Sequence, residues 1–170
     1  MSVKLSKKEI EENLRIKIPI WQKSPLKFVK DFWGMSPQPV LPEYQQALNI
    51  CIEQNELQAI RPEWFGQFQR GLHITWQQYL IFLAVEAAVN NRASKRISIA
   101  SANGIGKTCS MSLIVLWFLF CHYLAQIGVT APTSKQLFDV LWKELSIWIN
   151  HMPSYWADYF EWQSKYIRIK

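Results

Sequence analysis

The feature that most constrains the fold is the stretch SANGIGKT at residues 101–108, because it lies between two different apolar segments. Residues 97–101 (ISIAS) are a short apolar run rich in isoleucine, which predicts a buried strand. The long apolar run from residue 107 to about 122 predicts a helix. A strand, a glycine-containing turn and a helix in direct succession predict the first half of a βαβ unit.

The second half of this unit follows at once. Residues 128–131 (GVTA) predict a second short strand, which Pro132 ends. Thr133 and Gln136 have the spacing of a helix N-terminal capping box, so we expect a helix over residues 135–149. The alternation of strands and helices predicts an α/β fold, a parallel sheet with flanking helices and a right-handed crossover.

The end of the sequence bears on how complete this sheet is. Residues 166–170 alternate apolar and polar side chains like a strand, and then the chain stops. We therefore expect a domain truncated after its first two or three strands, which occupies residues 74–170.

The region before the sheet is predicted to be helical. Residues 1–25 are polar and basic, and we expect prolines to break them into a flexible segment. Residues 26–73 form a helical lead-in region, with one amphipathic helix over 27–33 and a second that begins at Pro42. A second capping box, Thr75 with Gln78, opens a predicted helix over residues 76–89.

The glycine-containing turn matches most of the phosphate-loop pattern GxxxxGK[ST]. Gly106, Lys107 and Thr108 match, whereas Ser101 stands where the pattern has its first glycine. Backbone N–H groups at a helix N-terminus bind phosphate, a lysine reaches the β- and γ-phosphates, and a hydroxyl completes a Mg²⁺ shell. We therefore predict an ATP and Mg²⁺ site, with Lys107 and Thr108 as its catalytic residues and Thr108 as the metal ligand. The predicted loop consists of Ser101, Ala102, Asn103, Gly104, Ile105, Gly106, Lys107 and Thr108.

Two further segments are candidates for the nucleotide site. Trp76 and Gln77 could contact a base, because a glutamine amide pairs with adenine N6 and N7 and an indole ring stacks on it. Alternatively, Trp76 packs in the core and Gln77 is a solvated helix residue. Residues 130–133 should face the nucleotide, because ligands gather at the carboxyl ends of parallel strands, although Thr133 is also a simple helix N-cap.

Composition narrows the function classes. The net charge is +6, but residues 1–30 alone carry +5, so the remainder does not by itself indicate a nucleic-acid face. Three cysteines without CxxC spacing favour a reducing, intracellular setting. Residues 111–125 are too short and too polar at their end for a membrane span of ~20 residues, so we expect a buried helix and no membrane.

One element of a phosphate-hydrolysing site is missing from the sequence. Such a site needs a second acid at the end of a neighbouring strand, and no apolar run ending in aspartate follows residue 133. Asp139 and Glu144 fall on a predicted helix instead. We expect the catalytic acid to lie outside these 170 residues.

The segments KFVKDFWGMSP, ITWQQ, ISIASANGIGKT and VTAPTSKQLFDVLWKEL together resemble the N-terminal part of a phage terminase large subunit, from about residue 27 to 149. This resemblance implies a RecA-like P-loop ATPase domain that drives double-stranded DNA into a procapsid, with Gln77 at the adenine-contacting position. It also implies a homo-oligomeric ring, a portal protein and a small terminase subunit as partners, and the host cytoplasm as location. The Walker B acids and the nuclease domain of that family have no counterpart in this sequence.

Three functions stay open at this point. The first is an ATP-binding segment of a DNA-packaging motor, from a bacteriophage or a prophage. The second is another P-loop NTPase, such as a small kinase or a helicase-like protein, although no arginine-rich lid is evident. The third is a non-catalytic docking module that uses the basic N-terminal segment.

Overall fold

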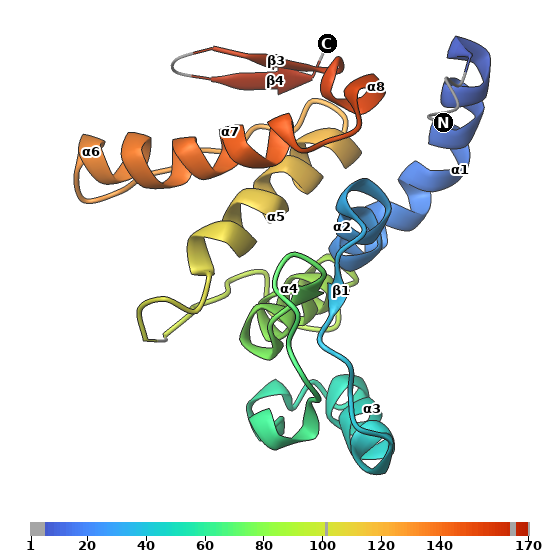
Figure 1. The fold of residues 1–170 in the computed structure, drawn as a ribbon, viewed down its shortest axis with the longest axis vertical. Coiled ribbons are helices and arrows are strands. Elements are labelled where there is room, and N and C mark those ends of the chain that lie inside the picture. The colour runs from blue at the N-terminus through green and yellow to red at the C-terminus, as the bar shows by residue number, and fades with distance from the viewer. Residues whose placement is uncertain (1–5, 101, 164–165, 170) are drawn as a thin grey trace.

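The computed structural model describes residues 6–100, 102–163 and 166–169, and its order of elements is shown in Figure 1. The elements are α1 (Lys7–Lys23), α2 (Pro25–Trp33), β1 (Ser36–Pro37), η1 (Pro42–Tyr44), α3 (Gln45–Glu53), η2 (Leu57–Ala59), η3 (Pro62–Trp64), β2 (His73–Ile74), α4 (Trp76–Val89), α5 (Lys107–Cys121), α6 (Ser134–Gln136), the π-helix η4 (Leu137–Trp142), α7 (Lys143–Asn150), α8 (Ser154–Ala157), β3 (Phe160–Trp162) and β4 (Ile167–Ile169).

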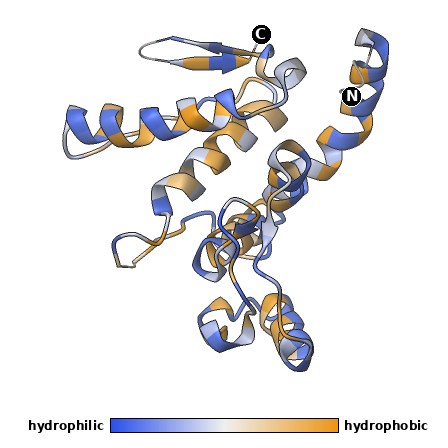
Figure 2. Cartoon of the chain, viewed as in Figure 1, coloured by the Kyte–Doolittle hydropathy of each residue, from blue (hydrophilic) through white to orange (hydrophobic). Residues whose placement is uncertain are grey.

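Helix α5 lies at the centre of the fold and is apolar along most of its length (Figure 2). Helices α1, α2, α4 and α7 all pack against it. Leu113, Leu116 and Trp117 of α5 are at most 1% exposed, which identifies the apolar run as a core helix. Within the described residues, no helix is both long and apolar enough to cross a membrane.

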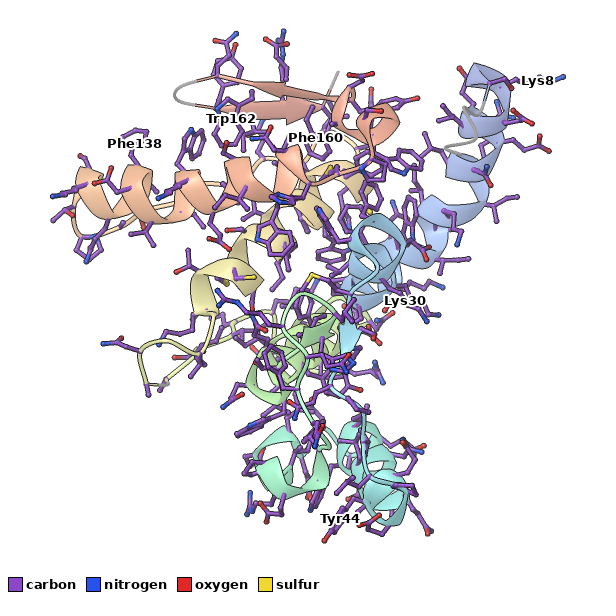
Figure 3. All side chains as sticks on the ribbon, viewed as in Figure 1. Lys8, Lys30, Tyr44, Phe138, Phe160 and Trp162 are labelled. Atoms are coloured by element: carbon purple, nitrogen blue, oxygen red, sulfur yellow. The ribbon has the colours of Figure 1, made fainter. Side chains whose placement is uncertain are left out.

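Two hydrophobic clusters hold the described residues together. The larger surrounds α5 and joins α1, α2 and the C-terminal elements, and the smaller lies between α3 and α4 around Leu48 and Leu83. In the upper part of the view, Phe160 and Trp162 of β3 lie between the β3–β4 hairpin and the helix below it (Figure 3). Their rings contact Phe120 and Trp142 at centroid distances of 5.7 and 5.2 Å.

Helix α1 corrects the expectation that prolines break the N-terminal segment, for the part of it that spans residues 7–23. Residues 7–23 form one helix that includes Pro19 and begins with a capping box between Ser6 and Glu9. Its C-terminal half is anchored because Trp21 is only 2% exposed. The Trp21 carbonyl accepts a hydrogen bond of 2.6 Å from Trp117 Nε1 of α5. Burial of one large aromatic side chain therefore outweighs the hydrogen bond that Pro19 removes.

The helices with local start or stop signals are confirmed. Both reciprocal bonds of the Thr75–Gln78 capping box are present at the start of α4. Gly34 ends α2 in the left-handed region, at φ 68°. The Thr133 hydroxyl accepts a hydrogen bond from Gln136 N at the start of α6, and the helical path continues through η4 to the end of α7.

The two strands predicted beside the glycine-containing turn are wrong for the residues that the structure describes. Residues 97–100 and 128–131 are irregular, residue 101 lies outside the described residues, and Ile97 is 40% exposed. Parallel strands are stable when both faces of their sheet are covered, and residues 97–100 are exposed instead. The sheets of the described residues are instead two-stranded: β1 with β2, parallel, and β3 with β4, antiparallel.

Candidate nucleotide-binding site

The glycine-containing turn ends in two left-handed residues. Gly104 and Gly106 have φ angles of 84° and 80°, which side chains with a Cβ rarely adopt. Gly106 is the N-cap of α5, and its carbonyl accepts the first helical hydrogen bond from Ser110 N at 3.0 Å. The N–H groups of the first turn of α5 have no partner within the helix and are available to an anion.

Lys107 is the first residue of α5, and its side chain folds back over the turn. Its Nζ donates a hydrogen bond of 2.8 Å to the Ala102 carbonyl oxygen. The side chain is half-buried rather than extended into solvent. This contact keeps the ammonium group beside the loop that the sequence predicts to bind phosphate.

Gln78 ties the loop to α4. Its Nε2 donates to the Gly106 carbonyl at 3.3 Å, while its Oε1 accepts from Thr75 N at 3.0 Å. The side chain is only 8% exposed. A Cβ on Gly106 would overlap Gln78 Nε2, so the backbone of the loop packs directly on this amide. The sequence assigns Gln78 only to the capping box, and nothing in its spacing points to the loop.

Trp76 and Gln77 do not meet the loop in the way that Gln78 does. The hydrogen bond from α4 to the loop is made by Gln78, and Gln77 is half-exposed one position before it. The Trp76 ring stacks on Phe65 at 6.4 Å and packs against the smaller cluster. The alternative of a packed Trp76 is therefore the arrangement that the structure shows, and contact of either residue with a base stays a prediction.

A cavity of about 390 Å³ begins at the loop. Lys107 and Thr108 border it on one side, and Thr130 and Ala131 border it on the other. The remaining lining residues are Met111, Val129, Gln136, Leu137, Val140 and Leu141. The sequence predicts that residues 130–133 face the phosphate loop, and the structure brings residues 130 and 131 to this cavity although no strand precedes them.

Behind Thr108, the first turn of α5 is held by α7. Burial, and secondly the negative charge of Glu144, raises the pKa of the Cys109 thiol to about 12. Cys109 is therefore a neutral thiol at physiological pH. Glu144 Oε1 in turn accepts a hydrogen bond of 3.0 Å from Trp148 Nε1. Glu144 thus contacts the buried side of the loop helix and is not among the residues that line the cavity.

The described residues offer little for a protein-bound metal. They contain no group of three or more histidine, cysteine, aspartate or glutamate side chains that could hold an ion. At the loop, the Thr108 hydroxyl is the group that the phosphate-loop pattern assigns to Mg²⁺. A cation there would be held chiefly by the phosphate oxygens of a nucleotide, which is how Mg²⁺ commonly binds at such sites.

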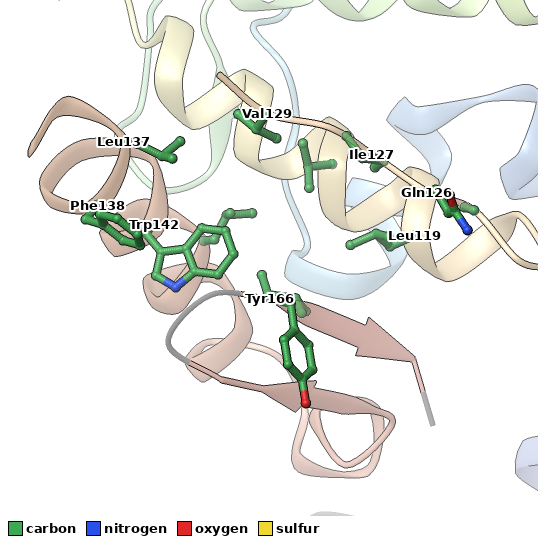
Figure 4. Close-up of a pocket in the computed structure, with 12 residues that line it drawn as sticks. Leu119, Gln126, Ile127, Val129, Leu137, Phe138, Trp142 and Tyr166 are labelled. Carbon is green, nitrogen blue, oxygen red and sulfur yellow. The ribbon is translucent and has the colours of Figure 1, made fainter. Parts of the chain in front are cut away.

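A second cavity, of about 360 Å³, is adjacent and shares Val129 and Leu137 with the first. It lies between α5, residues 125–129, η4 and the start of β4, and Figure 4 shows Trp142, Leu119 and Tyr166 around it. Trp142 Nε1 is buried without an acceptor among the described residues. The lining is mostly aliphatic and aromatic, and no lysine, arginine or histidine is among its described residues, so it lacks a cation for phosphate.

Comparison with protein-family models, with curated proteins and with solved structures gave no match at the level that would indicate a relative. The function is therefore argued from the geometry of the loop and its surroundings.

Proposed function

We propose that this chain is the ATP-binding segment of a DNA-packaging motor of the terminase large subunit type. The observation that carries the proposal is the cavity at the start of α5. Lys107 and Thr108 border it directly after two left-handed glycines, and Thr130 and Ala131 of the next segment close it. A lysine and a hydroxyl at the N-terminus of a long helix are the groups that bind a nucleotide triphosphate tail.

The proposed site works through the backbone as much as through side chains. The N–H groups of the first turn of α5 bind phosphate oxygens, and Gly104 and Gly106 allow the close approach that a Cβ would block. Lys107 exchanges the Ala102 carbonyl for phosphate oxygens, whose charge it neutralises. The Thr108 hydroxyl holds Mg²⁺, and the bound Mg-ATP supplies the phosphoanhydride whose hydrolysis drives the motor.

The fold that fits this function is an α/β P-loop domain of RecA-like type. Two irregular segments support this fold, because they border the same cavity of about 640 Å³ on α5. Ile97 comes from the segment before the loop, and Ile127 and Gly128 come from the segment after α5. Met111 and Phe118 of α5 form part of its apolar lining. In the proposed domain these two segments pair with strands that the described residues do not provide, and the sheet then covers this face of α5.

The motor activity itself belongs to a larger assembly. Asp139 is exposed on η4, and Glu144 lies behind the loop against Cys109. Neither lines the cavity at Lys107, so we expect this chain to bind ATP but to hydrolyse it very slowly. Double-stranded DNA, a portal protein, a small subunit and a homo-oligomeric ring in the host cytoplasm are part of the same proposal.

The test is titration calorimetry of the whole chain with Mg-ATP. We expect binding to the wild-type chain and its loss in Lys107→Ala. Lys143→Ala removes an exposed lysine from α7 and serves as the matched control, which should bind like the wild type. Far-UV circular dichroism of each variant establishes that it is folded. A folded wild-type chain without affinity, or a Lys107→Ala variant that binds as well as the wild type, would refute the proposal.

A further inference from the structure

A basic cleft lies at the other end of α4 from the loop. Three cations from three elements border a cavity of about 630 Å³: Lys23 at the end of α1, Lys27 in α2 and Arg92 after α4. Glu86 is the one acid among its lining residues, and the others are Pro19, Ile20, Ser24 and Asn90. Along α4, Asn90 is ~18 Å from Gln78, the residue that contacts the loop, at 1.5 Å per residue.

Hydrogen bonds fix the three elements relative to one another. Asn90 Nδ2 donates to the carbonyl oxygens of Lys23 and Glu86, at 2.8 and 2.7 Å. Ser24 Oγ, at the junction of α1 and α2, donates to Glu86 Oε2 at 2.6 Å. The backbone positions from which the cations project are therefore preorganised, so that little ordering is required when a ligand binds.

The charges around the cleft are not balanced. The carboxylate of Glu86 lies 4.0 Å from the guanidinium of Arg92, and the other ion pairs of the described residues involve neither Lys23 nor Lys27. Lys27 also stands in the first turn of α2, which has no acidic residue. A cation at that end of a helix is repelled by the helix dipole. Two uncompensated lysines in a concave surface therefore create an unfavourable positive potential that an anion would relieve.

We propose that this basic cleft binds phosphate groups, either of a free small anion or of a nucleic-acid backbone. Phosphate fits the cations, because a guanidinium presents paired donors to its oxygens and lysines add point charges. With three cations and the one carboxylate of Glu86, the lining keeps a net positive charge that suits a multiply charged anion. The cleft shares no lining residue with the cavity at Lys107, so the two sites are separable.

The experiment uses the full chain carrying Lys107→Ala, which removes the predicted contribution of the phosphate loop. Pyrophosphate and a 20-base-pair DNA duplex, about two helical turns, are titrated separately, at low and at high salt. The triple variant Lys23→Ala, Lys27→Ala, Arg92→Ala should bind about tenfold more weakly or worse. The matched control removes the same charge at exposed positions outside the cleft, Lys8, Arg15 and Lys143, and should retain the affinity.

Glu86→Gln provides a readout of opposite sign. It removes the one acid of the cleft while its amide oxygen can still accept from Ser24, so affinity should rise several-fold. Pyrophosphate binding that depends on the three cations identifies a free ligand, and duplex binding alone identifies the backbone; both support the proposal. If neither probe binds, if the control loses as much affinity as the triple variant, or if Glu86→Gln weakens binding in folded protein, the proposal is overturned. Mg-ATP binding by the chain with intact Lys107 is measured in parallel. Its result decides the proposed ATP site and has no bearing on the basic cleft.

Discussion

Replacing Gly106 by alanine tests whether the loop rests on Gln78. At φ 80° the backbone of an L-residue costs about 1–2 kcal/mol relative to glycine. The added Cβ would also overlap Gln78 Nε2 and lie 3.0 Å from its Cδ. Because Gln78 is 8% exposed and bonded to Thr75, its side chain must give up one or both of its hydrogen bonds, each worth about 1 kcal/mol. We expect Gly106→Ala to lower the free energy of unfolding by about 2–4 kcal/mol.

Gly104 supplies the matched control. Its φ angle is 84°, but a Cβ there would meet nothing within 4 Å. Gly104→Ala should therefore lower the free energy of unfolding only by the cost of the left-handed backbone, about 1–2 kcal/mol. The assay is urea unfolding of both variants and the wild type, followed by far-UV circular dichroism.

A double-mutant cycle with Gln78→Ala isolates the steric part. Without the amide, the Cβ at position 106 has room, so Gly106→Ala should then cost no more than Gly104→Ala. The expected coupling between Gly106 and Gln78 is about 1–2 kcal/mol. Equal destabilisation by the two alanines in the wild-type background, together with zero coupling, would refute the packing argument.

Two further predictions concern titratable groups. Burial raises the pKa of Asp31, but hydrogen bonds from Lys17 and Trp21 outweigh it and hold the pKa below its ordinary value. The ionised Asp31 side chain therefore stabilises the folded state above its ordinary pKa of about 3.9, and this stabilisation is lost as the pH falls through its lower folded-state pKa. The unfolding temperature of Asp31→Asn should consequently fall less steeply in acid than that of the wild type. A slope unchanged by the substitution contradicts this. The Cys109 thiol is half-buried and its pKa is raised to about 12, so at pH 8 it should react with a disulfide reagent much more slowly in the native than in the unfolded protein. Equal labelling rates of native and unfolded Cys121→Ala, Cys51→Ala protein would contradict this.

The parts of the fold that the sequence predicted well are those with local causes. The start of α4 follows from Thr75 and Gln78, which are three residues apart, and the end of α2 follows from Gly34. The parallel pairing of β1 with β2 has no such signal, because it joins residues 36–37 to residues 73–74. The persistence of α1 through Pro19 also depends on a distant contact, that of Trp21 with Trp117.

The candidate site likewise has features with local causes, which the sequence predicts, and features that depend on tertiary packing. A glycine-containing turn was predicted before the apolar helix, and both of its glycines have positive φ angles. The choice between Gln77 and Gln78 depends on which side of α4 faces the core. Since α4 is apolar on nearly all sides, its sequence carries no amphipathic stripe that would fix this orientation. The structure resolves it, because Gln78 lies on one face with the buried Phe82.

Helix packing, rather than a sheet, holds the proposed phosphate loop of residues 102–108 in this chain. Gln78 of α4 contacts Gly106 at the end of the loop, and Glu144 of α7 contacts Cys109 one residue after Thr108. Both contacts act on the first turn of α5, whose later turns are buried in the core. The loop geometry therefore does not require residues 97–100 to be paired in a strand. It follows that the proposed phosphate affinity and sheet formation are separable properties. Substitutions at the exposed Ile97 should leave the proposed nucleotide binding unchanged, whereas loss of the Gln78 contact should weaken it even where the helices remain folded.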